Sequence, residues 1–314
     1  MTDNYGRRIE YMRLSVTDLC NYRCIYCMSD SGVEKLSYSD ILSIEELTDI
    51  ARASYELGIN KIRLTGGEPL IRRGIVELCR NIRDISPEIE LSMTTNGSLL
   101  KSMAAQLKDA GLDRLNISLD TLDPDKFRYI TRRGELSDVL SGIRSAMQAG
   151  FESTKINVVL MGGINDGEIA ELIELTRDYD ICVRFIELMP MGVVSGWEPE
   201  RFLSCSAVGA MLKESQQIYT DGVATVYRPT GHKGSVGLIT PMSDRFCDRC
   251  NKIRVTADGR LKPCLHSDTE IPLRGLGYEE LKAAIKSGIL AKPMSHELDT
   301  NTSGTHRCMN EIGG

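Results

Sequence analysis

Six of the ten cysteines stand in two tight triplets, and the first triplet has the spacing of a cluster-binding loop. Cys20, Cys24 and Cys27 form a C-x3-C-x2-C motif directly after a strand-like run at 12–16. Thiolates are soft ligands that suit zinc or iron–sulfur clusters. A [4Fe–4S] cluster normally takes four cysteines, so a loop that supplies three would leave one iron open to a substrate or cofactor. The spacing therefore predicts a catalytic cluster.

The second triplet consists of Cys247, Cys250 and Cys264, with the spacing C-x2-C-x13-C. His266 could be a fourth ligand of a zinc ribbon, because structural zinc takes four cysteine or histidine ligands. Spacing alone leaves zinc and an iron–sulfur cluster equally open for this triplet.

A glycine-rich motif, Gly66-Gly67-Glu68-Pro69, ends a second strand-like run at 61–65. Glycines let a backbone approach a ligand closely, and the carboxylate of Glu68 can accept a hydrogen bond from an ammonium group. Such a motif alone most often means a tight turn. Its position, one strand–helix unit after the first triplet, instead associates it with the metal site.

Strand-like and helix-like segments alternate over the first two-thirds of the chain. The strand-like runs are 12–16, 61–65, 89–94, 114–119, 155–160 and 181–188, and the helix-like runs are 43–58, 73–85, 99–111, 136–150, 166–179 and 205–214. Six such units imply a parallel sheet with right-handed crossovers. Since a closed (β/α)8 barrel needs two more units, we expect an α/β fold with an incomplete (β/α)6 TIM-like barrel rather than a doubly wound sheet.

One face of every predicted strand is polar. Alternation of side chains along a strand gathers on these faces Arg13, Ser15, Lys61, Arg63, Thr65, Ser92, Thr94, Asn96, Asn116, Ser118, Asp120, Lys155, Asn157 and Arg184. For any one of them, a strand end that reaches solvent is a sufficient explanation. Because the pattern recurs in all the strands, it favours a polar lumen whose cations bind an anionic, phosphorylated ligand.

After residue 215 the pattern changes to short β-prone runs separated by glycine and proline. We therefore expect two units in the chain. The first is the partial barrel at 1–215, and the second is a smaller, β-rich C-terminal extension of strands and loops at 216–314, which carries the second triplet.

Composition limits the classes of function. The 314 residues are 41% hydrophobic and 26% charged, which is typical of a globular protein. A net charge of −6 argues against non-specific nucleic-acid binding. No apolar run reaches the roughly 18 residues of a membrane helix, and the polar N-terminus lacks the apolar segment of a signal peptide. We therefore expect a cytoplasmic protein with neither nucleic acid nor membrane as partner.

The first triplet, with Tyr26 before its last cysteine and Gly66–Pro69 after it, resembles the radical S-adenosylmethionine superfamily. The resemblance implies that S-adenosylmethionine chelates the open iron of a [4Fe–4S] cluster. One electron from that cluster then cleaves the cofactor to a 5′-deoxyadenosyl radical.

The run FCDRCNKIRVTADGRLKPCLH at 246–266 resembles one subfamily, the GTP 3′,8-cyclases of molybdenum-cofactor biosynthesis. Further similar segments are 6–28, 61–73, 94–97, 164–168, 183–192 and 312–314. This resemblance implies a second [4Fe–4S] cluster on the second triplet, with its open iron facing the guanine of GTP. It also implies a lyase in which the radical takes the ribose 3′ hydrogen and the ribose then attacks guanine C8, giving 3′,8-cyclo-7,8-dihydro-GTP.

The resemblance assigns contacts residue by residue. The contacts to S-adenosylmethionine fall on Tyr26, Gly67, Ser118 and Met189, beside the candidate Glu68, and those to GTP fall on Arg13, Arg63, Thr94, Lys155, Arg184, Lys252 and Arg254. Lys252 stands where the family has arginine, so it keeps the charge and loses the two-pronged donor. The tail Gly313-Gly314 is expected to reach the active site and to assist the chemistry.

The resemblance also implies partners: a low-potential electron donor of flavodoxin or ferredoxin type, the next enzyme of the pathway, and a second copy in a homodimer. Two other hypotheses stay open. One is a radical S-adenosylmethionine enzyme that acts on a peptide and uses an auxiliary cluster, which binding of GTP would exclude. The other is a zinc-ribbon interaction protein on a degenerate barrel, which would hold zinc in place of iron.

Overall fold

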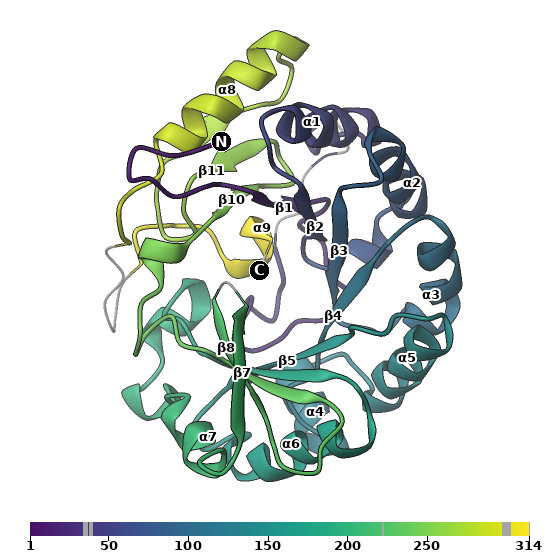
Figure 1. The fold of residues 1–314 in the computed structure, drawn as a ribbon, viewed down its shortest axis with the longest axis vertical. Helices are drawn as coiled ribbons and strands as arrows, with labels where there is room; N and C mark the ends of the chain where they lie inside the picture. Colours follow the sequence, from purple (N-terminus) through teal and green to yellow (C-terminus); the bar gives the residue numbers. More distant parts are fainter. Residues whose placement is uncertain (34–36, 38–39, 222, 297–302, 314) are drawn as a thin grey trace.

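The computed structural model describes residues 1–33, 37, 40–221, 223–296 and 303–313. Its sheet has 12 strands in the order β12-β11-β10-β1-β2-β3-β4-β5-β6-β9-β8-β7. Most of the helices form a ring outside the strands, and α9 (Met309–Ile312) lies inside that ring (Figure 1). Gly314 lies outside the described residues.

The six predicted strand–helix units are present. The strands are β1 (Tyr11–Ser15), β2 (Lys61–Thr65), β3 (Glu90–Thr95), β4 (Arg114–Ser118), β5 (Lys155–Leu160) and β6 (Cys182–Glu187). The predicted helices are α1 (Ile44–Glu56), α2 (Ile75–Ile85), α3 (Leu100–Asp109), α5 (Leu136–Gln148), α6 (Ile169–Asp178) and α7 (Ser206–Met211). Each of β1–β5 pairs in parallel with the next strand along the chain.

One helix in this region was not predicted, α4 (Pro124–Thr131). The Asp123 carboxylate caps it by accepting hydrogen bonds from the backbone N–H groups of Asp125 and Lys126, at 2.8 and 3.0 Å. Proline at the first helical position suits such a start. An aspartate–proline pair is also a turn signal, so the sequence pattern did not distinguish a helix start from a turn at this position.

The C-terminal third extends the same sheet on both sides. β9 (Ser235–Ile239) pairs in parallel with β6, and β10 (Lys252–Val255) pairs in parallel with β1. β7 (Gln216–Asp221) and β8 (Ala224–Arg228) continue one edge, and β11 (Arg260–Lys262) and β12 (Ile271–Pro272) continue the other, all antiparallel. The two edges do not meet, so the incomplete barrel is confirmed.

The expectation that the C-terminal region contains only strands and loops was wrong. It contains the helices α8 (Tyr278–Leu290) and α9 (Met309–Ile312). The backbone N–H of Gly277 donates to the Glu280 carboxylate at 3.0 Å, which closes the first turn of α8. None of the described helices is long and apolar enough to span a membrane.

The strand faces divide as the alternation predicts. Outward-facing residues such as Leu14, Ile62 and Phe185 are fully buried beneath the helices. The opposite faces carry the polar residues and line the lumen. The hydrophobic core is therefore the layer between strands and helices, and the lumen is left to polar chemistry.

We predict that Gly142→Ala destabilises the protein by about 1–3 kcal/mol, the usual cost of overpacking. A Cβ at position 142 of α5 would lie 2.2 Å from the carbonyl oxygen of Gly97. The matched control is Gly209→Ala in α7, where the nearest atom to a new Cβ is 3.9 Å away. This control should be neutral or stabilising by up to about 1 kcal/mol, because alanine is the better helix former. Thermal unfolding followed by circular dichroism measures both changes, and equal effects would refute the packing argument.

Candidate active site

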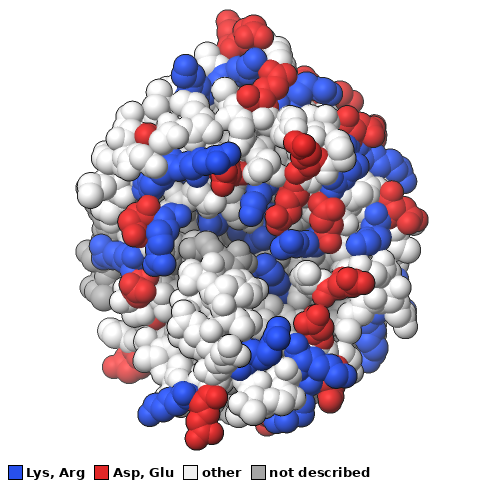
Figure 2. Space-filling view, viewed as in Figure 1, with Lys and Arg blue, Asp and Glu red and all other residues white. Residues whose placement is uncertain are grey.

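Both cysteine triplets line one cavity of about 370 Å³ in the lumen of the barrel. The cysteines in its wall are Cys20, Cys24, Cys27, Cys247, Cys250 and Cys264. Figure 2 shows a hollow at the centre of one face of the molecule, with Lys and Arg side chains within it and at its rim. Two motifs that are more than 200 residues apart in the sequence thus share one chamber.

The first triplet lies at the carboxyl end of the barrel, on the loop after β1. Backbone N–H groups of Arg23 and Ile25 donate to the carbonyl oxygens of Thr131 and Ile130, at 3.0 and 2.9 Å. Arg132, which has a φ of 60°, donates from Nη1 to the carbonyl oxygens of Arg23 and Met28. The unpredicted helix α4 therefore holds the cluster loop through its last turn.

The Gly66–Glu68 turn packs directly against the segment that leads to Cys20. Backbone N–H groups of Gly67 and Glu68 donate to the carbonyl oxygens of Thr17 and Leu19, both at 2.8 Å. A Cβ on Gly67 would lie 2.2 Å from the Leu19 carbonyl oxygen. Glycine is required here because two backbone segments touch, in addition to any approach of a ligand.

Glu68 is fully buried and is not among the residues that line the cavity. Its carboxylate accepts hydrogen bonds from Leu70 N, Thr95 Oγ1 and Asn96 N, at 3.0, 2.7 and 2.7 Å. Burial raises the pKa of this carboxyl to about 7. In this geometry Glu68 braces the turn against the loop after β3, and its contact with an ammonium group stays a prediction.

The surroundings of the first triplet disfavour the thiolate form of its cysteines unless a cation is bound. Burial raises the pKa of the Cys20 thiol to about 11 and that of Cys27 to about 12. Burial, followed by the charges of Cys27 and Asp120, raises the pKa of Cys24 well above its usual value. Bound metal is what turns such thiols into thiolates, so the three side chains fit an iron–sulfur cluster.

The arrangement of the cysteines fits a multi-iron cluster better than a single zinc ion. Among the described residues, no three His, Cys, Asp or Glu side chains come close enough together to hold a single metal ion. Zinc with Zn–S bonds of ~2.3 Å would need sulfurs within roughly 4 Å of one another, whereas a multi-iron cluster separates its thiolates further. His266 instead bonds Ser303 Oγ at 3.1 Å and packs against His296.

Four residues predicted to contact S-adenosylmethionine line the cavity near the first triplet. They are Tyr26, Gly67, Ser118 and Met189. The Tyr26 hydroxyl donates to Asp120 Oδ2 at 2.8 Å, and Asp120 Oδ1 accepts from Val159 N at the same distance. Asp120 was on a predicted polar face but had no predicted role, and the structure shows that it orients Tyr26.

The second triplet lies at the opposite, amino end of the barrel. Cys247 and Cys250 precede β10, and Cys264 follows the antiparallel β11. The buried Lys292 Nζ joins these segments by donating to the carbonyl oxygens of Lys252 and Pro263, at 2.8 and 2.9 Å. Burial alone would raise the pKa of Cys250, but the charges of Lys292 and Lys252 lower it. Lys292 follows α8 outside any motif, so no sequence signal marked it.

Five Lys and Arg residues line the cavity, and three of them, Arg13, Lys252 and Arg254, are predicted GTP contacts; the other two are Arg7 and Lys292. Arg13 and Arg254 are register partners on the paired strands β1 and β10. Burial lowers the pKa of Lys252 to about 8, and the charges of Arg63 and Arg13 contribute. Cations crowded in a buried space are stabilised by an anion, so this region fits a phosphorylated ligand.

Three predicted GTP contacts lie on the same sheet face outside the cavity wall. Arg63 donates to Ser92 Oγ at 3.1 Å and lies over the Tyr11 ring, while Lys155 and Arg184 are 9% and 5% exposed. Their contact with GTP stays a prediction. Thr94 Oγ1 and Asn157 Oδ1, by contrast, belong to cavity-lining residues and have no hydrogen-bond partner among the described residues. Both oxygens are available to a ligand.

The C-terminal tail enters the lumen. The Gly313 carbonyl oxygen accepts hydrogen bonds from Arg13 Nε at 3.2 Å and from Arg254 Nη1 at 3.0 Å. A Cβ on Gly313 would lie 2.2 Å from Thr65 Oγ1, so a larger residue does not fit. The expected approach of the tail to the site is thus visible for Gly313, while Gly314 lies outside the described residues.

Known proteins share this fold and these motifs. Residues 14–176 match the Radical SAM superfamily, and residues 181–298 match the family Molybdenum Cofactor Synthesis C. The crystal structure of Streptococcus suis SuiB bound to S-adenosylmethionine superposes with a TM-score of 0.62 at 15% identity, covering 84% of this chain and 63% of that chain. Coproporphyrinogen III oxidase HemN from Escherichia coli gives 0.51 at 14% identity, covering 90% and 70%. Fold and site together define a member of the radical S-adenosylmethionine superfamily.

The family within it follows from sequence. The chain is 49% identical to the GTP 3′,8-cyclase of Alkaliphilus metalliredigens (strain QYMF) and 48% identical to that of Alkaliphilus oremlandii (strain OhILAs), over 100% of each chain. It belongs to the GTP 3′,8-cyclase family.

We predict that Asp120→Asn changes how stability depends on pH in the cluster-free protein. Burial raises the pKa of Asp120 to about 6, against about 3.9 in an unfolded chain. Its stabilising contribution is therefore complete below pH ~4 and is lost as the pH rises through about 6. Between pH 4 and 7.5 the wild type should lose about 2–3 kcal/mol relative to the variant, since one pKa unit is ~1.4 kcal/mol. Urea unfolding at both pH values measures this difference, and parallel pH profiles would contradict the assignment.

Proposed function

We propose that this protein converts GTP to 3′,8-cyclo-7,8-dihydro-GTP, the first step of molybdenum-cofactor biosynthesis. The observation that carries the proposal is the one cavity whose wall contains both cysteine triplets and five Lys and Arg side chains. A ligand in this cavity meets a cluster site at each end, and its anionic part meets the arginines. GTP has the base, ribose and triphosphate that such a chamber can receive.

At the carboxyl end, Cys20, Cys24 and Cys27 would hold a [4Fe–4S] cluster with one open iron. When bound there, the cluster and S-adenosylmethionine would supply the radical that removes the ribose 3′ hydrogen. The ribose carbon would then bond to guanine C8, and one electron from the reductant with one proton would complete the 7,8-dihydro product. Tyr26, held by Asp120, would position the cofactor with Gly67, Ser118 and Met189. The enzyme would be a lyase. No side chain is assigned as acid or base, so the protein would act by positioning the reactants.

At the amino end, Cys247, Cys250 and Cys264 would hold a second [4Fe–4S] cluster whose open iron binds the guanine. Arg13, Lys252 and Arg254 would bind and orient the nucleotide, together with Arg63, Lys155 and Arg184 on the same face of the sheet. Lys292 would support this cluster by fixing both cysteine-bearing segments. The surrounding wall would exclude water and oxygen from the radical.

The remaining parts of the proposal concern organisation and partners. Residues 1–215 would act as the radical unit and residues 216–314 as the unit that carries the second cluster and the tail. A low-potential flavodoxin or ferredoxin would supply the electron, a homodimer would be the assembled form, and the product would pass to the next enzyme in the cytoplasm.

Deuterium transfer tests the reaction directly. The anaerobic, reconstituted protein is mixed with S-adenosylmethionine, a reductant and GTP deuterated at ribose C3′. We expect deuterium in the 5′-deoxyadenosine and a cyclised nucleotide in equal amount. Cofactor cleavage without deuterium transfer, together with no binding of GTP, would reject the proposal in favour of another substrate such as a peptide.

We predict that Arg184→Ala weakens GTP binding by about tenfold or more while uncoupled cleavage of S-adenosylmethionine stays close to wild type. Loss of a charged hydrogen-bonding partner costs about 1.5–3 kcal/mol. The control is Arg114→Ala. Arg114 lies on the same face of the sheet, but its side chain is 43% exposed and pairs with Glu90 at 3.7 Å. Equilibrium binding of GTP and 5′-deoxyadenosine release are measured for both variants. A fall in cleavage at unchanged GTP affinity would show that the lumen assignment is wrong.

We predict that Cys250→Ser removes the second cluster and abolishes cyclisation but spares the first cluster. Iron should fall from about eight to about four per chain, with matching sulfide, as expected for two [4Fe–4S] clusters and then one. Iron, sulfide and zinc analysis after anaerobic reconstitution measures this, and Cys79→Ser, in the buried face of α2, is the control. About four iron and one zinc in the wild type would make the second triplet a structural zinc site.

A further inference from the structure

The C-terminal tail contacts groups of both sites although its own secondary structure is minimal. The Asn310 backbone N–H donates to the Cys27 thiol, and Asn310 Nδ2 donates to the Asp18 carbonyl oxygen at 3.2 Å. Gly313 lies on Arg13 and Arg254, as described above. Helix α9 has only 4 residues, and one helical turn is not stable by itself. Contacts outside this short helix are therefore needed to help hold the tail in the lumen.

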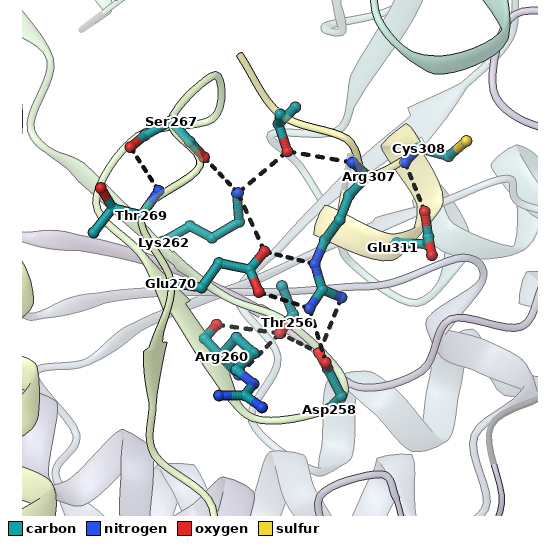
Figure 3. A network of polar contacts seen from close by, with 11 residues as sticks. Thr256, Asp258, Arg260, Lys262, Ser267, Thr269, Glu270, Arg307, Cys308 and Glu311 are labelled. Atoms are coloured by element: carbon teal, nitrogen blue, oxygen red, sulfur yellow. Dashed lines mark hydrogen bonds and ion pairs between the residues drawn. The ribbon is translucent and has the colours of Figure 1, made fainter. Parts of the chain in front are cut away.

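Arg307 makes contacts of this kind (Figure 3). Its Nε and Nη2 donate to the two carboxylate oxygens of Glu270, at 2.6 and 2.8 Å. Its Nη1 and Nη2 donate to the two oxygens of Asp258, at 3.2 and 2.9 Å. One guanidinium thus makes two bidentate carboxylate pairs, the strongest geometry for such contacts.

The surroundings strengthen this cluster beyond a surface ion pair. The side chains of Arg307, Asp258 and Glu270 are each only about a quarter exposed. Burial alone would raise the pKa of both carboxyls, but the hydrogen bonds of Arg307 lower them. The fully buried Lys262 adds a second link, since its Nζ donates to Glu270 Oε1 and to Thr305 Oγ1 of the tail, at 3.3 and 3.2 Å.

The partners of Arg307 lie on the strands that build the active site. Asp258 is in the turn between β10 and β11, and Glu270 immediately precedes β12. β10 carries Arg254, which binds Gly313, and β11 leads to Cys264. Arg307 and Gly313 therefore contact the same β10–β11 hairpin. Arg307 contacts its turn, and Gly313 contacts its first strand.

We propose that Arg307 is a positioning residue that anchors the tail through Asp258 and Glu270 and so places Gly313 on Arg13 and Arg254. This inference rests on the proposed function, because the proposed reaction is what gives the tail a role in the lumen. Arg307 does not touch the cavity, and it acts only through the segment that follows it.

Digestion of the cluster-loaded protein with carboxypeptidase, followed by mass spectrometry, tests the anchor without any turnover. We expect Arg307→Met to release C-terminal residues at least tenfold faster than wild type. Arg307→Lys, which keeps the charge and loses the fork, should fall between them. Arg260→Met is the matched control, an exposed arginine on the same hairpin, and should digest like wild type. Asp258→Asn provides a second disruption from the partner side.

A kinetic measurement separates positioning from general structural damage. In Arg307→Met, kcat for cyclisation should fall at least tenfold, while KM for GTP stays within about twofold and iron and sulfide per chain stay at the wild-type value. Arg307→Lys should recover part of kcat. Wild-type digestion rates in Arg307→Met, or loss of iron together with kcat, would overturn the proposal. If the wild type itself made no cyclised product while the digestion result held, the proposed function would fail and the anchor would stand.

Discussion

The parallel pairing of β10 with β1 is the interaction on which the site depends. β1 leads directly into the loop of the first cysteine triplet, and β10 directly follows Cys247 and Cys250 of the second triplet. Placing these two strands side by side, with Arg13 opposite Arg254 and Tyr11 opposite Lys252, sets the triplets at opposite ends of one lumen. Neither triplet alone forms a chamber. The pairing also brings together the like charges of Arg13 and Arg254, and both guanidinium groups donate to the carbonyl oxygen of Gly313.

Local pattern predicted the part of the fold in which neighbours in sequence are neighbours in space. The alternation of strands and helices over 12–188, the polar faces and the position of both triplets all follow from short-range periodicity, and the structure has them. The pairing of β9 with β6 and of β10 with β1 joins segments that are far apart, and strands of four or five residues with glycine nearby carry no signal for their partner. Lys292 and Arg307 escaped prediction for the same reason, since each acts through carbonyl or carboxylate oxygens that only the fold assembles.

The two ends of the chamber differ in charge, and the difference matches two tasks. Around Cys24 of the first triplet, burial, the charges of Cys27 and Asp120 and that of Cys20 raise the pKa of the thiol, so a bound cation would favour its thiolate form. Around the second triplet, Lys252 and Lys292 already favour the thiolate of Cys250. In the proposed reaction, the cationic half would accept the anionic substrate beside the second triplet, and the other half would accept S-adenosylmethionine, whose sulfonium and ammonium groups give it a net positive charge.

The order of the sheet has a consequence for biosynthesis of the chain. β1 and β6 are the outermost of the first six strands, and their partners β10 and β9 are made only in the last third of translation. At ~5–20 residues per second, the outer edge of β1 waits unpaired for tens of seconds after that strand has left the ribosome. An unpaired edge is a template for association with other chains. The nascent barrel therefore needs protection of this edge, by a chaperone or by the early helices, until β10 covers it in the folded protein.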